Sequence, residues 1–245
     1  MLPADTFTAI LANPYVATLF WSAATILLYL AAKRLYRRFP KWWLTPLGVT
    51  PLLLIALVIG LNADYSGYFN ATHWLVALLG PATVAFAIPI FQQRATIRRY
   101  WLVLMVGVLV GSSVAMLSAW VLAQLLGLNE AIRLSLLPRS MSTPFAMTVS
   151  GGIGGTPDLT AIFVVLTGVF GAALGEVMLN WLPIRTALAR GALFGMGAHG
   201  AGVAKAHQIG REEGSIAGLV MVLVGLVNVL AAPLIAHLLY RPYGL

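Results

Sequence analysis

Long apolar segments separated by short polar ones run through almost the whole chain. Clean apolar runs lie at about residues 14–35, 100–126, 159–182 and 215–239. A helix needs about 20 apolar residues to cross the hydrocarbon core of a bilayer, which is roughly 30 Å thick. The pattern therefore predicts a helical membrane protein that crosses the bilayer several times.

Other apolar segments are interrupted. Residues 46–61 form a short run, residues 74–91 contain Pro81 and Pro89, and residues 186–208 are rich in glycine and only weakly hydrophobic. With a helix starting near Glu130, the pattern predicts an all-α polytopic membrane fold of about eight transmembrane or half-membrane helices. We expect one integral membrane domain over residues 1–245, with a first helix and basic loop over 1–42 and the remainder over 43–245.

The stretch at residues 137–158 is polar although its surroundings are apolar. It combines prolines, glycines and hydroxyl side chains between two segments that we interpret as spanning the membrane. Backbone that is not regularly helical is tolerated at membrane depth only where it is buried in protein or lines a watery cavity. This stretch is therefore the first candidate for a binding site.

A faint internal repeat is also present. A segment broken by glycine or proline and followed by a long helix recurs near residues 72, 130 and 187. Secondary transporters build central sites from such repeats, although biased membrane composition can produce the same similarity by chance. If one broken segment is re-entrant rather than spanning, the repeat becomes inverted and the loops change sides.

The net charge of +8 is explained by the loops rather than by a nucleic-acid partner. Lys and Arg gather between the apolar runs, where the positive-inside rule places them on the cytoplasmic side. With all segments crossing, the inner loops hold Lys33, Arg34, Arg37, Arg38, Lys41, Arg94, Arg98, Arg99, Lys205 and Arg211. The outer side then holds Arg133, Arg139, Arg185, Arg190 and Arg241, and both chain ends lie outside.

Arg139 is the clearest single clue to chemistry. A guanidinium inside a helix-breaking segment is costly in lipid, so it should face protein or water and find an anionic partner. Its planar fork suits a carboxylate. Alternatively, Arg139 reaches the outer interface or pairs with Glu176 or Glu130. The substrate-binding set predicted here is Arg139, Ser140, Ser142, Thr143, Gly151, Gly152 and His199.

His199 lies in a run of small residues that allow close helix packing. Its imidazole could hydrogen-bond a substrate or couple transport to protons, or it could be a satisfied contact between helices. Glu176 is a second candidate for coupling, and its alternative is a solvated position near the end of its helix.

Enzymatic chemistry is disfavoured. The absence of cysteine excludes thiolate catalysis and Cys-ligated metals. Ser150 and His199 are available for an intramembrane hydrolase, but the sequence has neither a Gly-x-Ser-x-Gly elbow nor a His-Glu-x-x-His pair. We expect no enzyme activity, no metal and no cofactor.

Three motifs carry a family resemblance. Residues 139–147 (Arg-Ser-Met-Ser-Thr-Pro-Phe-Ala-Met), residues 197–206 (Gly-Ala-His-Gly-Ala-Gly-Val-Ala-Lys-Ala) and residues 79–89 are similar to the LrgB/CidB family of bacterial membrane proteins. Plastidal glycolate/glycerate translocators are relatives of that family. Met141 and Val203 depart from the family's usual Val and Thr.

The resemblance implies two functions. One is a transporter, or transport subunit, for small monocarboxylates or 2-hydroxy acids such as pyruvate, glycolate or glycerate. The other is a holin/antiholin-like regulator of murein hydrolase activity and autolysis that acts with a small LrgA/CidA-like membrane protein. We expect transport as the main activity, in a homo-oligomer embedded in the bilayer of the bacterial inner (cytoplasmic) membrane.

Overall fold

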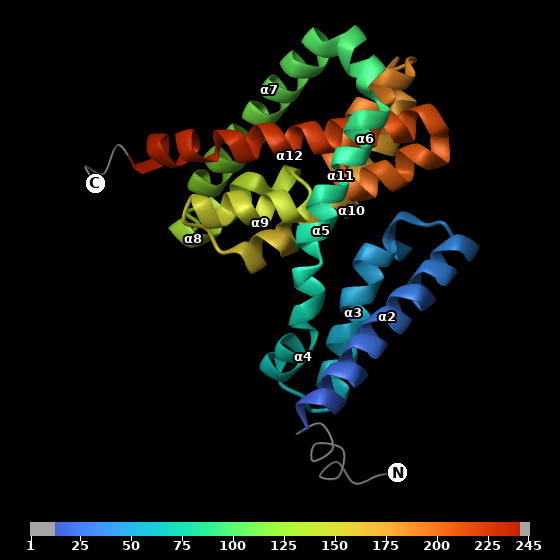
Figure 1. The fold of residues 1–245 in the computed structure, drawn as a ribbon, viewed down its shortest axis with the longest axis vertical. Coiled ribbons are helices and arrows are strands. Elements are labelled where there is room, and N and C mark those ends of the chain that lie inside the picture. Colours follow the sequence, from blue (N-terminus) through green and yellow to red (C-terminus); the bar gives the residue numbers. More distant parts are fainter. Residues whose placement is uncertain (1–12, 241–245) are drawn as a thin grey trace. The chain divides into compact units, whose positions relative to one another are not determined.

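The computed structural model describes residues 13–240, with side chains to residue 237, so that Arg241 lies outside the described part. It is all-α and divides into two compact units, Met1–Ala82 and Thr83–Leu245. Figure 1 shows the helices, coloured in chain order from the N-terminus to the C-terminus.

The described part of the first unit consists of α2 (Pro14–Arg38), η1 (Trp42–Leu44), α3 (Pro46–Gly60) and α4 (Tyr65–Ala77). Asn13 caps α2, because its side chain accepts a hydrogen bond from the Tyr15 backbone amide. The indole of Trp74 donates a 2.8 Å hydrogen bond to Ser22, which joins α4 to α2. Helix α5 (Leu79–Ala85) carries the chain across the boundary between the units.

The second unit contains the polar stretch. Its elements are α6 (Ala87–Gln92), α7 (Arg94–Leu125), α8 (Glu130–Leu136), η2 (Leu137–Ser140), α9 (Thr143–Gly152), α10 (Pro157–Trp181), α11 (Ala187–Ile209) and α12 (Arg211–Tyr240). The α10 bounds lie within about two residues of the predicted run.

Several helices of the described chain are long and apolar enough to span a membrane. They are Pro14–Arg38, Tyr65–Gln92, Arg94–Leu125, Pro157–Trp181 and Arg211–His237, with Pro46–Gly60 as a shorter apolar helix. The prediction of a helical multi-pass membrane protein is therefore confirmed. Helix α11 is not among these spans.

Helix α11 folds back on itself at His199. The backbone there has φ 37° and ψ −118°, which is not helical. A side chain added at Gly202, on the second arm, would collide with the carbonyl oxygen of Phe194 on the first arm. Phe194 and Ala206 also share one buried cluster. The two arms, residues 187–198 and 200–209, therefore lie against each other as a helical hairpin.

The hairpin corrects the predicted crossing over residues 186–208. Phe194 packs against Gly175, and the Nζ of Lys205 lies 2.8 Å from Oε2 of Glu176, so both arms reach the same end of α10. Arg190 and Glu213 form a 4.0 Å ion pair at the base. Because the chain turns back at His199, Arg185 and Arg190 lie on the same side as Lys205 and Arg211 rather than opposite them.

A second broken segment approaches the other end of α10. The Thr156 amide donates a 2.8 Å hydrogen bond to the Ser135 hydroxyl, and the Thr160 hydroxyl donates a 3.0 Å bond to the Ser135 carbonyl. The α8–η2–α9 segment thus leaves from and returns to the region where α10 begins. The two broken segments enter the second unit from opposite ends of α10, an arrangement that an inverted repeat would give.

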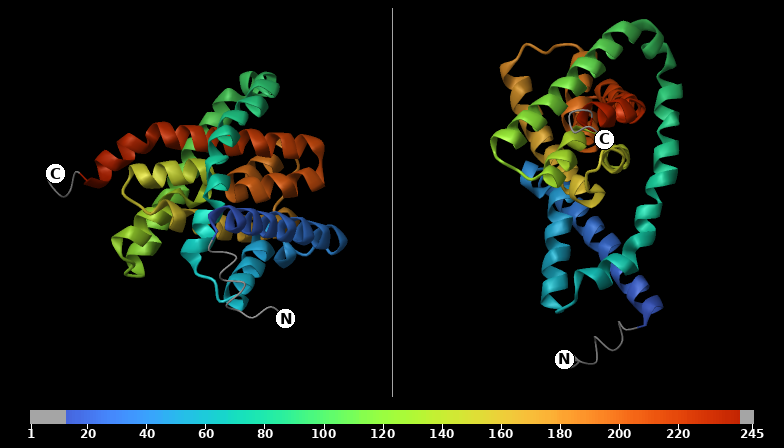
Figure 2. Two further views of the ribbon diagram at one scale, coloured as in Figure 1. Left: turned by 60° about the horizontal axis from the view of Figure 1, so that its bottom comes forward. Right: turned by 90° about the vertical axis from the view of Figure 1, so that its left-hand side faces the viewer.

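Helix α12 packs against both broken segments. The ring of Phe145 in α9 lies against Gly225, whereas Gly191 and Gly195 in α11 lie against Ile216 and Ala217. Figures 1 and 2 show α9 and α11 along different halves of α12. The buried core around these contacts includes Leu137, Met141, Val149, Ile153, Val164, Leu219 and Val224.

Candidate functional site

The break between α8 and α9 is built by two prolines. Pro138 lies at the start of the short η2 helix, and Pro144 lies at the start of α9. Met141 and Ser142 between them are extended, with ψ of 166° and 147°. Because Pro138 has no N–H to donate within a helix and Pro144 fits a helix's first turn, the sequence ends one helix and starts another here.

Ser142 occupies the N-cap of α9 without capping it. Its side chain forms no hydrogen bond to the helix, and its buried Oγ has no partner in the described structure. A buried hydroxyl without a hydrogen bond costs free energy. The start of a helix also presents unpaired amides and a positive dipole end, which favour an anion. Both features are compatible with an anionic ligand at this position.

Arg139 lies in η2, three residues before Ser142, and is only partly buried. Within the described residues it forms neither an ion pair nor a hydrogen bond. The alternative pairing with Glu176 is wrong, because Glu176 binds Lys205 instead. By contrast, the guanidinium of Arg133 stacks at 4.8 Å over the ring of Trp120. Arg139 is thus free to bind an anion.

His199 is the tip of the α11 hairpin. Its side chain is buried, its ring lies against Gly168 of α10, and its Nε2 has no hydrogen-bond partner in the described structure. The positive φ is uncommon for a residue other than glycine and costs of order 1–3 kcal/mol. A strained backbone and an unpaired nitrogen at one buried residue indicate a functional position.

The two broken segments meet inside the second unit. Element η2, which carries Arg139 and Ser140, contacts both α10 and α11. Ser142 and Thr143 follow at once in the chain, at the start of α9. A guanidinium, a free hydroxyl and a helix start could hold a small carboxylate here, and His199 could add a hydrogen bond or carry a proton.

Other predicted site residues lie elsewhere. Gly151 and Gly152 are exposed at the C-terminal end of α9, separated from Thr143 by a helix about 15 Å long. Glu176 is exposed at the base of the α11 hairpin. Neither the two glycines nor Glu176 is brought to the Arg139 segment.

Sequence reasoning missed a hydroxyl cluster with a structural role. Ser150 and Thr160 share a 2.7 Å hydrogen bond, and Thr160 also bonds to the Ser135 carbonyl. All three side chains are fully buried. A hydroxyl composition alone does not separate such an interhelical cluster from a ligand site, because both need the same residue types.

Comparisons with known proteins find one family model and several relatives that each match most of the chain. The LrgB-like family matches residues 25–238. "Uncharacterized protein YwbG" of Bacillus subtilis is 40% identical over 209 residues, which cover 85% of this chain and 93% of that protein. "Antiholin-like protein LrgB" of Bacillus subtilis is 34% identical over 195 residues, covering 80% of this chain and 84% of that protein.

A third relative has a different name. "Holin-like protein CidB" of Staphylococcus aureus is 28% identical over 228 residues, which cover 93% of this chain and 100% of that protein. No solved structure matches the chain.

Proposed function

Because this chain belongs to the LrgB-like family of bacterial membrane proteins, we propose that it is a holin-like or antiholin-like regulator of murein hydrolase activity and autolysis in the inner membrane. The observation that carries this proposal is the near full-length similarity to relatives with those names. A small LrgA/CidA-like membrane protein is the proposed partner.

The test of this role is an autolysis measurement in cells. Deletion of the gene should change the rate of detergent-induced lysis and the murein hydrolase activity on a zymogram, and a plasmid copy should restore both. The partner should co-purify with the full chain from solubilised membranes. Unchanged lysis and unchanged hydrolase activity in the deletion strain would reject this role.

A second candidate function is transport of a small monocarboxylate or 2-hydroxy acid, and the interior of the second unit favours it. The observation that carries it is the meeting of two broken segments that contain an unpaired Arg139, an unpaired Ser142 hydroxyl and an unpaired His199 nitrogen. A purely regulatory scaffold needs no such groups in the interior, where each of them is costly.

In this second proposal each residue has a role. The Arg139 guanidinium binds the carboxylate, and Ser142 with the α9 amides adds hydrogen bonds to it. His199 donates a hydrogen bond or carries the coupling proton. The hairpin and the α8–η2–α9 segment enter from opposite sides, so relative movement of the two would expose the ligand to each side in turn.

The two candidates are separable by experiment. Purified protein in liposomes should accumulate labelled pyruvate or glycolate if transport is its activity. A regulator that moves no solute leaves the vesicles impermeable while its deletion still changes lysis. If the liposomes take up the acid and deletion also changes lysis, the protein has both roles, because a flux of organic acid then accompanies the control of lysis.

A further inference from the structure

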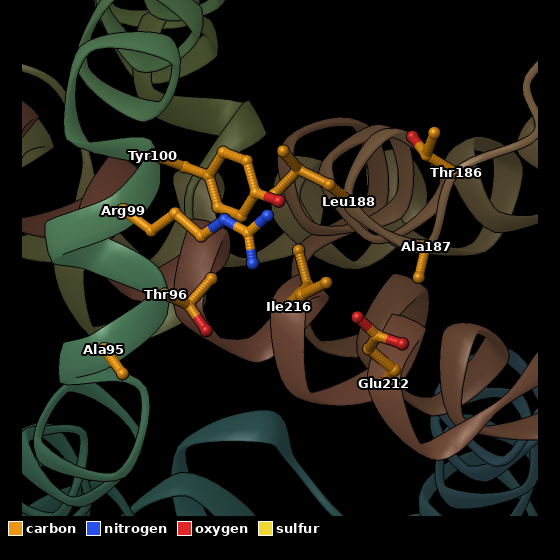
Figure 3. Close-up of a pocket in the computed structure, with 9 residues that line it drawn as sticks. All are labelled: Ala95, Thr96, Arg99, Tyr100, Thr186, Ala187, Leu188, Glu212 and Ile216. Carbon is orange, nitrogen blue, oxygen red and sulfur yellow. The ribbon is translucent and has the colours of Figure 1, made fainter.

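A cavity of about 330 Å³ lies at the base of the α11 hairpin, away from the His199 tip. Figure 3 shows its lining, which comes from three helices and the turn before α11. The lining residues are Ala95, Thr96, Arg99, Tyr100, Thr186, Ala187, Leu188, Glu212 and Ile216. A cavity of this size is at the lower end of the range for small-ligand sites.

The cavity lies where the membrane-spanning helices begin. The spans Arg94–Leu125 and Arg211–His237 both start beside it. The exposed residues Arg94 and Arg98 lie one turn apart at the start of α7, as expected for the cytoplasmic face. The apolar side of the cavity is formed by Leu188 and Ile216, which belong to the packed core. The site is therefore at a boundary between water and membrane.

Two opposite charges face this cavity without pairing. Figure 3 shows the side chains of Arg99, from α7, and Glu212, from α12, directed into the same space. Both are exposed, and neither forms an ion pair with another described residue. The neighbouring acid Glu213 is different, because it already pairs with Arg190 at 4.0 Å.

Arg99 is held in place by Tyr100. Its guanidinium carbon lies 5.1 Å from the centroid of the Tyr100 ring, within the range of a cation–π contact. Tyr100 has non-helical angles, φ −117° and ψ 20°, so α7 is kinked at the residue that positions the cation. Thr96 also lines the cavity; its hydroxyl donates a 2.9 Å hydrogen bond to Gln93 Oε1, which leaves its oxygen as an acceptor.

We propose that this cavity binds a phosphoethanolamine group, with the phosphate on Arg99 and the primary ammonium on Glu212. A zwitterion matches the unpaired cation and the unpaired anion together, whereas a simple anion leaves Glu212 facing it unfavourably. The planar fork of Arg99 suits phosphate oxygens, and the carboxylate of Glu212 accepts hydrogen bonds from an ammonium. The group can come from a membrane lipid or from a free small molecule.

The first measurement is a calorimetric titration of the detergent-solubilised full chain with phosphoethanolamine and with phosphocholine. We expect tighter binding of phosphoethanolamine, because a quaternary ammonium donates no N–H hydrogen bond to Glu212. Arg99→Gln and Glu212→Gln should each weaken binding at least about tenfold. Arg98→Gln, one residue from the site, and Arg139→Ala, at the other site, should leave it unchanged.

The second measurement identifies the source of the group. Native mass spectrometry of protein taken from mixed phosphatidylethanolamine and phosphatidylcholine nanodiscs should show retained phosphatidylethanolamine in the wild type and in Arg98→Gln, but not in Arg99→Gln. Lipid retention assigns a lipid headgroup, and binding of the soluble compound alone assigns a free molecule.

Three results would overturn the proposal. They are no binding in either measurement, equal binding of both headgroups, and binding that survives both Arg99→Gln and Glu212→Gln. If binding survives in those variants while their thermal stability falls, the two side chains are instead a water-bridged pair that joins α7 to α12, and the proposal fails.

Discussion

At the scale of single residues, three polar groups of the candidate site have no partner in the described structure. These are the Arg139 guanidinium, the Ser142 hydroxyl and the His199 Nε2 atom. Most buried polar groups in folded proteins are hydrogen-bonded, and each exception needs an explanation. A ligand that reached all three groups would explain them together.

Arg139 is the residue on which the binding hypothesis depends most. Pyruvate should raise the midpoint of thermal unfolding of the wild type by about 2 °C or more at a saturating concentration, because a ligand of the folded state stabilises it. Arg139→Ala should remove this rise, because it removes the cation that binds the carboxylate.

The matched control is Arg98→Ala, which removes an exposed arginine of the same unit. It should keep the full rise in the unfolding midpoint. If pyruvate raises the unfolding midpoint of Arg139→Ala as much as that of Arg98→Ala, Arg139 does not contact the ligand.

His199 allows strain and chemistry to be separated. Glycine adopts a φ of 37° without steric cost, whereas alanine does not. His199→Gly should therefore unfold at a higher temperature than His199→Ala, by an amount equivalent to about 1 kcal/mol. Pyruvate should not raise the unfolding midpoint of either variant, since both lack the imidazole. Equal stability of the two variants would argue against a strained backbone at this position.

At the scale of elements, hydropathy predicts the regular helices well and the broken ones poorly. The predicted run over residues 159–182 corresponds to α10, Pro157–Trp181. The run over 186–208 is weakly apolar and rich in small residues, a composition that suits either a crossing or a hairpin. The turn falls on His199, although Gly197 and Gly200 are the residues that propensity favours for a positive φ.

Composition singles out candidate site residues, but it does not show which of them the fold brings together. Arg139, Ser142 and His199 stood out because charge, hydroxyl groups and helix breakers are unusual at membrane depth. Gly151 and Gly152 were grouped with them because their region has a turn-like composition. The chain instead forms α9 between Thr143 and Gly152, which moves the two glycines to the far end of a helix.

The close packing of the α11 hairpin on α10 can be tested by glycine-to-alanine substitutions, which add a single methyl group. A side chain at Gly171 would collide with the carbonyl oxygen of Gly197, whereas a side chain at Gly197 would meet nothing within 4 Å. Gly171→Ala should lower the free energy of unfolding by about 1–3 kcal/mol. Gly197→Ala should leave it unchanged or raise it slightly, because alanine favours a helix. Equal effects in thermal unfolding would contradict the hairpin packing.

At the scale of the whole second unit, the hairpin changes the distribution of charge. The loops and termini on the α11 base side carry Arg94, Arg98, Arg99, Arg185, Arg190, Lys205 and Arg211. The opposite side carries Arg133 among the described residues. The excess of Lys and Arg on one side of the second unit is larger than it would be if α11 crossed the membrane. By the positive-inside rule, the base of the hairpin is then expected in the cytoplasm.

The lack of native cysteine makes this topology accessible to labelling. Arg185→Cys and Gln208→Cys, at the two ends of the hairpin, should both react with a membrane-impermeant maleimide only from the cytoplasmic side. Glu130→Cys, at the start of α8, should react only from the opposite side. If positions 185 and 208 react from different sides, α11 crosses the membrane and does not form a hairpin.

The most direct test of the transport proposal, in which the two broken segments form a route for a small organic acid, is uptake of labelled pyruvate by liposomes that contain the purified protein. The account predicts uptake by the wild type and by Arg98→Ala, and no uptake above empty liposomes by Arg139→Ala of equal folded content. Equal uptake by Arg139→Ala, or impermeable vesicles with folded wild-type protein, would contradict it.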